Sequence, residues 1–333
     1  MKKIFAILLL ACMVLSLAAC GGAKTAEYKL GMGVSLNMNS SKAGNAQVDA
    51  CCAVVVLDAD GKIVACRIDV AQNKMDVTDG QVDTAKTFLT KVELGDDYNM
   101  VKYSDATHEW YEQAAAFEEY CVGKTADEIA NMETVVNESG HTVTTDETLY
   151  ASCSISIDQF QDAVVKACND DQAATFTSDG TFTLGLAINS TAAESTAATA
   201  EEEGVVKMYS EFGAVVLDKD GKILAALTDA TQPQIKIDAA GEIGDKTFKG
   251  TKRELKEGYN MVAYSDATLE WYQQAKNFTD YCVGKTAADL RATETKTNDE
   301  GHNVFVDETL YASCSISVQG MIDVVAKACD NAK

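Results

Sequence analysis

Most of this chain is a single segment that occurs twice. The stretch YNMVKYSDATHEWYEQAAAFEEYCVGKTA, which begins at Tyr98, returns from Tyr259 as YNMVAYSDATLEWYQQAKNFTDYCVGKTA. The stretch DETLYASCSIS is unchanged between residues 146–156 and 307–317. A repeat this long is a duplicated domain, because the units of solenoid proteins are much shorter. The 333 residues therefore need no large single core.

The match between the copies extends towards their starts, where LGMGVSLN from Leu30 corresponds to LGLAINST from Leu184. We place the two repeats at residues 28–170 and 178–333. Residues 189–204 of the second repeat read NSTAAESTAATAEEEG, a small, polar and acidic stretch. This composition predicts a flexible acidic loop.

Three strands are predicted near the start of each repeat. In the first repeat, the alternating residues 30–37 and the β-rich runs 52–57 and 62–68 have the pattern of strands. The last two flank Asp58–Gly61, a turn whose glycine can adopt a positive φ. A calcium loop would need a bidentate Glu where Val70 stands, so we favour the hairpin turn.

Helices are predicted after the strands. Apolar residues recur every three or four positions from Ala106 to Cys121, which is typical of an amphipathic helix. Thr125 with Glu128 has capping-box spacing for a second, short helix, and Ser156 with Gln159 has it for the last one. The fold class expected is α+β, with two repeated domains that are each an antiparallel sheet with packed helices.

The N-terminus has the pattern of a secretory signal peptide. Lys2 and Lys3 precede an apolar run, and the Leu17–Cys20 tetrad, LAAC, resembles the lipobox of bacterial lipoproteins. The resemblance implies removal of residues 1–19 and diacylglycerol on Cys20, with residues 20–27 as a tether. An ordinary cleaved signal with an incidental cysteine is the alternative. We expect a membrane-anchored protein on the extracytoplasmic face of the cell membrane.

The charge of the chain is strongly acidic. It has 28 Lys and Arg against 51 Asp and Glu, a formal net charge of -23. Phosphate backbones repel such a chain, so no nucleic-acid partner is expected.

The eleven cysteines permit two interpretations. Export allows disulfides, and three positions of the first repeat, Cys121, Cys153 and Cys168, recur in the second as Cys282, Cys314 and Cys329. Cys121 and Cys168 fall on apolar faces, where a free thiol packs as a small hydrophobic group. We favour reduced, buried thiols over a bridge.

Aromatic and histidine residues also recur. Helical spacing predicts that Trp110 and Trp271 are core residues, and it leaves open that an aromatic ring lines a ligand groove. His141 and His302 follow a glycine in a polar turn, without partners at metal-ligand spacing, and we interpret them as loop histidines.

The element DETLYASCSIS places hydroxyl groups directly before a predicted helix. In the first repeat, Ser154, Ser156 and the first free amides of that helix could hold an anion, because the helix dipole favours negative charge there. Capping of the helix by Ser156 is the alternative, although it explains only one hydroxyl. Both interpretations remain open.

The order of a VVxLDxDGKI hairpin, a helical middle and an Asp-led turn before a final helix resembles the FMN-binding domain. That domain occurs in subunits of sodium-pumping quinone reductases, in Rnf-type complexes and in surface flavolipoproteins of extracellular electron transfer. There an Asp precedes an S-G-A-T turn whose Thr can carry FMN through a phosphoester bond. The resemblance implies a candidate FMN site in each repeat: Asp146, Ser152, Ser154 and Ser156 in the first, and Asp307, Ser313, Ser315 and Ser317 in the second.

Within this motif, Ser154 and Ser315 stand at the acceptor position, and Asp146 and Asp307 stand for the leading Asp. A serine replaces the glycine that lets the backbone approach the flavin phosphate, which favours non-covalent over covalent FMN.

The function that the resemblance implies is a flavin-based electron relay at the cell surface, with a redox partner in the membrane. We expect such a protein to carry electrons or bind a ligand rather than to convert a substrate as an enzyme does. The alternative is a non-redox surface module that binds a ligand or an envelope component and has lost flavin binding.

Overall fold

The structure is a computed structural model that describes residues 25–333. The expected leader, the lipid-attachment residue Cys20 and most of the tether lie outside these residues. Within residues 25–333, no helix is both long enough and apolar enough to cross a membrane.

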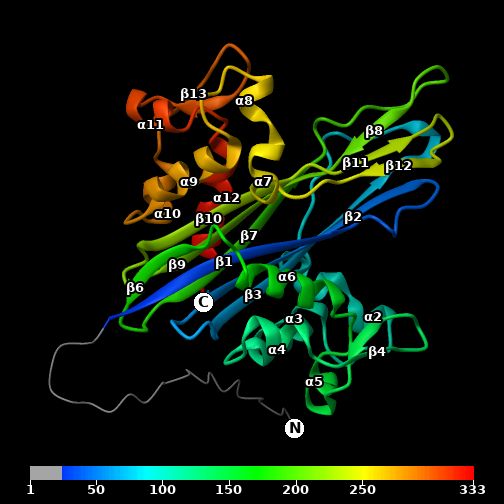
Figure 1. Ribbon diagram of the computed structural model, residues 1–333. Coiled ribbons are helices and arrows are strands. Elements are labelled where there is room, and N and C mark those ends of the chain that lie inside the picture. Colours follow the sequence, from blue (N-terminus) through cyan, green and yellow to red (C-terminus); the bar gives the residue numbers. More distant parts are fainter. Residues whose placement is uncertain (1–24) are drawn as a thin grey trace, which may run out of the picture.

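The first repeat is a four-stranded antiparallel sheet with helices on one face (Figure 1). Its strands, in the order β3-β2-β1-β6, are β1 (Ala26–Asn37), β2 (Asn45–Leu57), β3 (Ile63–Asp76) and β6 (Ala174–Ser178). Its helices are α1 (Lys91–Leu94), α2 (Met100–Tyr103), α3 (Trp110–Cys121), α4 (Ala126–Ala130), α5 (Glu147–Ser152) and α6 (Asp158–Cys168). A small hairpin, β4 (Thr134–Val136) with β5 (Thr142–Thr144), precedes α5.

The second repeat has the same order of helices on a three-stranded sheet. Its strands, in the order β10-β9-β7, are β7 (Thr183–Thr191), β9 (Tyr209–Leu217) and β10 (Ile223–Thr231). Its helices are α7 (Lys252–Leu255), α8 (Met261–Tyr264), α9 (Trp271–Cys282), α10 (Ala287–Arg291), α11 (Glu308–Ser313) and α12 (Gln319–Asp330). The hairpin of β13 (Thr295–Thr297) with β14 (Asn303–Phe305) corresponds to β4 and β5. A further small sheet joins β8 (Gly204–Lys207), β11 (Gln234–Ile237) and β12 (Ile243–Thr247).

These elements confirm the expected α+β class with antiparallel sheets and packed helices. The predicted turn between β2 and β3 is present, with Gly61 at φ 75°. The first long helix starts at Trp110, later than predicted from Ala106, because Glu109 and Glu112 form a capping box there. The capping box of Thr125 with Glu128 is also formed, at the start of α4.

Glycines let the last helix of each repeat lie directly on its sheet. A Cβ on Gly31 of β1 would stand 2.0 Å from the carbonyl oxygen of Ala167 in α6. The equivalent Gly185 of β7 has the same relation to Ala328 of α12, also at 2.0 Å. Any side chain at these positions would push the helix away from the strands.

The two repeats share a core, because the faces of their sheets that carry no helices pack against each other. In Figure 1 the two sheets lie in the middle, with α3–α6 on one side and α9–α12 on the other. Matching positions of the two copies meet in this layer, among them Leu30, Met32 and Val34 of β1 with Leu184, Leu186 and Ile188 of β7. Each repeat also has an outer core between its sheet and its own helices. The arrangement is therefore helix–sheet–sheet–helix, and the middle layer belongs to both repeats.

The boundaries expected for the repeats need two corrections. The interval between them, residues 171–177, contains most of β6, which pairs with β1 and widens the first sheet. Residues 189–204 are not a loop throughout, because Asn189–Thr191 belong to β7 and Gly204 begins β8. Between these strands the backbone is anchored: Ala192 and Ala198 are buried, and Thr196 bridges to Val205.

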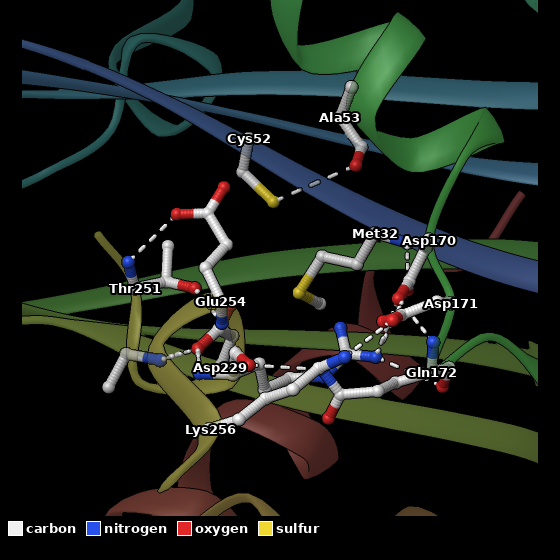
Figure 2. Close-up of polar contacts among 12 residues, drawn as sticks. Met32, Cys52, Ala53, Asp170, Asp171, Gln172, Asp229, Thr251, Glu254 and Lys256 are labelled. Atoms are coloured by element: carbon white, nitrogen blue, oxygen red, sulfur yellow. Dashed lines mark hydrogen bonds and ion pairs between the residues drawn. The ribbon is translucent and has the colours of Figure 1, made fainter. Parts of the chain in front are cut away.

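A buried ion pair also joins the repeats. The Arg253 guanidinium in α7 lies 3.0 Å from Asp170 Oδ2, and both side chains are 7% exposed. Asp170 also accepts a hydrogen bond from the Met32 backbone, and the Arg253 backbone amide donates to Asp229 in β10. Figure 2 shows Asp170, Gln172 and Asp229 in this network, where the end of the first repeat meets α7.

Candidate functional site

The two candidate aspartates cap short helices. Asp146 accepts hydrogen bonds from the backbone amides of Thr148 and Leu149 at the start of α5. Asp307 caps α11 in the same way, at 2.9 and 3.0 Å. One carboxylate oxygen of each Asp is thus used by its own helix, and six helical residues separate that Asp from the following turn.

The serines in the glycine position of the motif point back into these helices. Ser152 donates to the carbonyl oxygen of Leu149 at 3.1 Å, and Ser313 donates to that of Leu310 at 2.9 Å. A hydroxyl in this geometry donates its hydrogen bond to the backbone of its own helix and not to a ligand.

The serines at the acceptor position are held by two buried glutamines. Ser154 donates through its amide and its hydroxyl to Gln113 Oε1, at 2.9 and 3.3 Å. Ser315 makes the same two bonds to Gln274 Oε1, at 2.7 and 3.2 Å. Both glutamines are almost completely buried, on α3 and α9. We did not single them out from the sequence, although they recur at the same place in both copies.

The predicted capping of the last helix by Ser156 is wrong. Its hydroxyl accepts a hydrogen bond from the Thr142 amide of β5, at 3.0 Å, and Ile157 is the residue that precedes α6. Ser156 lies one residue too early to cap the helix. Its hydroxyl instead links the β4–β5 hairpin to the turn before α6.

In the second repeat, part of the candidate motif lines a large cavity. The cavity has a volume of about 1060 Å³, and Ser315, Ser317 and Gly320 line it at the start of α12. Three aromatic residues, Tyr209, Tyr259 and Trp271, line it as well. Trp271 is only 4% exposed, which confirms that it is a core residue, and it borders the cavity as well.

A buried lysine lies among these rings. Lys252 is 8% exposed, and its Nζ lies 5.1, 5.0 and 5.2 Å from the ring centres of Tyr209, Tyr259 and Trp271. Burial lowers the pKa of Lys252 to about 8. The rings stabilise the ammonium through cation–π attraction, which replaces part of the lost hydration.

A half-buried glutamate, Glu211, also lines the cavity. Tyr209 donates to Glu211 Oε1 at 3.4 Å, and burial raises the pKa of Glu211. A Cβ on Gly320 would stand 2.1 Å from Glu211 Oε2. The absence of a side chain at position 320 therefore makes room for this carboxylate.

The other carboxylates stand at the mouth of the cavity. Glu194, Asp266, Asp299 and Glu300 line it and are all exposed to solvent. Glu194 is paired with Lys207 at 3.6 Å. Water and salt screen such charges, so they act on a ligand at the cavity floor less than Lys252 and Glu211 do.

In the first repeat, the equivalent space is built from different residues. Phe160 stands where the second repeat has Met321, and it packs edge-on against Trp110 with 5.6 Å between ring centres. Gln159 replaces Gly320 and donates to the carbonyl oxygen of Asp49. Cys51, fully buried, replaces Glu211. At these positions the first repeat therefore has a phenylalanine, an amide and a thiol, where the second has a methionine, a glycine and a carboxylate.

The contacts of the two repeats differ in how well they would accommodate the FMN that the resemblance implies. A phosphoester on Ser154 or Ser315 would replace the hydrogen bond that each hydroxyl donates to a buried glutamine, so these contacts disfavour covalent FMN. The first repeat does not fit a flavin ring beside Trp110, where Phe160 already packs. The second repeat fits a flat ring and one anionic group, through its aromatic walls and Lys252.

The cysteines and the histidines are the remaining groups that the sequence singles out. The nine cysteines of residues 25–333 are free thiols, and seven of them are buried. Over the same residues, no group of three or more His, Cys, Asp or Glu side chains is arranged to hold a metal ion. His302 lies at the cavity mouth, and His141 lies in the matching loop of the first repeat.

Comparison with known proteins found no family model, no curated protein and no solved structure that matches this chain.

Proposed function

We propose that the chain is a lipid-anchored binding protein on the extracytoplasmic face of the membrane, and that its second repeat binds one small ligand. The observation that carries the proposal is the difference between the repeats. Gly320 and Met321 line a cavity of about 1060 Å³, whereas Gln159 and Phe160 occupy the matching positions of the first repeat. Concave sites with apolar walls and a few polar groups are the usual form of ligand pockets.

The geometry of the walls indicates a flat ligand. Tyr209, Tyr259 and Trp271 offer ring faces and edges on one side of the cavity. Aromatic rings stack on one another with about 0.5–1.5 kcal/mol beyond the free energy of area burial. Ser315 and Ser317 also line the cavity, and their hydroxyl oxygens can accept hydrogen bonds from polar substituents.

The test is a titration with flat ligands of graded charge: lumiflavin, FMN and anthracene-2-carboxamide. Chain from Gly21 is mixed with each, and tryptophan fluorescence and calorimetry give affinity and stoichiometry. We expect one site per chain. The matched control is the triple variant Glu211→Cys, Gly320→Gln, Met321→Phe, which gives the second repeat the residues of the first and should abolish binding. Two equal sites per chain, or binding that survives in the triple variant, would refute the assignment to the second repeat.

A second candidate function is a one-flavin electron relay, served by a redox partner in the membrane. The aromatic walls and the cation at the cavity floor favour it. If it is correct, protein purified from cells that make flavins is yellow, and acid denaturation releases the flavin because no covalent bond holds it. Colourless protein that does not bind FMN leaves the non-redox binding protein as the function.

A further inference from the structure

The side chain of Lys252 is a buried cation without an ionic partner. Over residues 25–333, no carboxylate lies within ion-pair distance of its Nζ and no side chain or carbonyl accepts a hydrogen bond from it. A Lys ammonium has three donors, and Lys252 Nζ is not among the fully buried polar atoms that lack a partner, so its donors face the cavity. The three rings around it attract the charge but accept no ordinary hydrogen bond.

The other cations of the same region are paired. Lys207, also at the cavity, lies 3.6 Å from Glu194. Arg253, the next residue after Lys252, lies 3.0 Å from Asp170. Lys252 is thus the cation at the cavity whose donors are available to a ligand.

We infer that the ligand of the second repeat carries one carboxylate-type anionic group, which pairs with the Lys252 ammonium while the flat body of the ligand lies against Tyr259 and Trp271. This inference rests on the proposed function and names the chemical class of its ligand. A charge-assisted hydrogen bond at this position gives the ammonium an acceptor that no side chain or carbonyl of residues 25–333 provides.

Two alternatives fit the cavity less well. A cationic ligand would meet the positive charge of Lys252, which lies over the rings of Tyr209 and Tyr259. A dianionic phosphate would have to pass four exposed carboxylates at the mouth and would find one unpaired cation at the floor. Glu211 also lines the cavity and interacts with Lys252, so a single negative charge on the ligand meets less repulsion there than a dianion does.

The first repeat offers a matched control. Lys91 is the counterpart of Lys252 and lies 4.9 and 5.0 Å from the ring centres of Tyr98 and Trp110. Asp49 replaces the third ring, Tyr209, and the Lys91 side chain is more exposed than that of Lys252. A substitution of Lys91 therefore removes the same charge from a similar cage without touching the cavity.

The experiment uses two isosteric probes, anthracene-2-carboxylate and anthracene-2-carboxamide, with the chain from Gly21. Fluorescence titration should give the carboxylate at least tenfold higher affinity than the amide. Lys252→Met should reduce the affinity for the carboxylate to that for the amide, and leave the amide within twofold. Lys91→Met should change neither.

The outcomes separate the two proposals. Equal affinity for both probes in the unsubstituted chain overturns the inference, and the ligand cavity stands. Binding of neither probe overturns the ligand cavity itself, and the inference with it. Circular dichroism checks that Lys252→Met is folded. If Lys252→Met is not folded, the two probes are compared in the Lys91→Met chain instead. A tenfold preference for the carboxylate that persists in this chain supports Lys252. Loss of the preference assigns it to Lys91.

Discussion

The Lys327 ammonium, in the last helix of the second repeat, lies 2.6 Å from the Glu93 carboxylate, in the first helix of the first repeat. The same pair occurs with the repeats exchanged, because Lys166 lies 3.3 Å from Glu254. Strand contacts are reciprocal as well: β3 faces β7, and β10 faces β1. The two copies are therefore related by an approximate two-fold axis, as the subunits of a symmetric dimer are.

The two ion pairs predict unequal contributions to stability. The side chains of Lys327 and Glu93 are 28% and 25% exposed, whereas those of Lys166 and Glu254 are 40% and 41% exposed. We expect a double-mutant cycle of Lys327→Met with Glu93→Gln to give a coupling free energy of about 1 kcal/mol in urea unfolding. The cycle of Lys166→Met with Glu254→Gln is the control and should give less. Equal couplings would contradict the role of burial.

The buried pair of Arg253 with Asp170 predicts a larger effect. Arg253→Met leaves Asp170 buried without its cation, and we expect a loss of about 3–5 kcal/mol in the free energy of unfolding. Asp170→Asn in the Arg253→Met background should restore part of it, since it removes the uncompensated charge. The exposed pair of Lys256 with Asp171 is the control, and Lys256→Met should cost less than about 1 kcal/mol. A loss at Arg253 no larger than at Lys256 would show that the pair between the repeats does not stabilise the fold.

Two buried carboxylates predict how stability depends on pH. Asp69 in β3 and Asp229 in β10 accept backbone hydrogen bonds at the start of α1 and α7, and burial raises the pKa of each to about 6. Between about pH 4 and pH 6 these two carboxyl groups hold more protons in the folded chain than in the unfolded chain. Their contribution to the free energy of unfolding therefore falls as pH rises through this window.

The measurement is urea unfolding at pH 4, 5, 6 and 7. Asp69→Asn and Asp229→Asn keep an oxygen acceptor for the backbone amides and remove the titration, so each should flatten the decline. Asp58→Asn, in the exposed hairpin turn, should not. A decline of unchanged slope in the double variant Asp69→Asn, Asp229→Asn would assign the pH dependence to other groups.

The cysteines predict an order of chemical labelling. Cys168 and Cys329 are partly exposed, and the other seven thiols of residues 25–333 are buried. Burial raises the pKa of Cys329 to about 11 and that of Cys168 to about 12, so even these react slowly near neutral pH. We expect iodoacetamide at pH 8 to label Cys329 and Cys168 first, as read by intact mass and peptide mapping. Early labelling of Cys51 or Cys66 would contradict the burial of the sheet.

The fold was largely predictable because its signals are local. Alternation, turn glycines and capping boxes give the strands of the first sheet, the hairpin at Asp58–Gly61 and helices α3 and α4. The shared middle layer was missed, although a signal exists. Residues 53–57, AVVVL, are apolar without alternation, which indicates a strand covered on both faces.

The site was only partly predictable. The motif led to Ser315 and Ser317, which do line the cavity. Lys252, Glu211 and Tyr209 come from other segments, and their meeting depends on how the sheet and helices pack, which local patterns do not specify. Comparison of the copies could have identified them, since Cys51, Asp49 and Gln159 of the first repeat become Glu211, Tyr209 and Gly320 in the second.

The contact between Glu211 and position 320 links one glycine of α12 to the place of one carboxylate. A Cβ at position 320 would lie 2.1 Å from Glu211 Oε2. Because Oε2 is the end of a flexible side chain, a substitution of Gly320 would displace the carboxylate without excluding the glutamate. The consequence would be a rearranged cavity wall on an intact backbone.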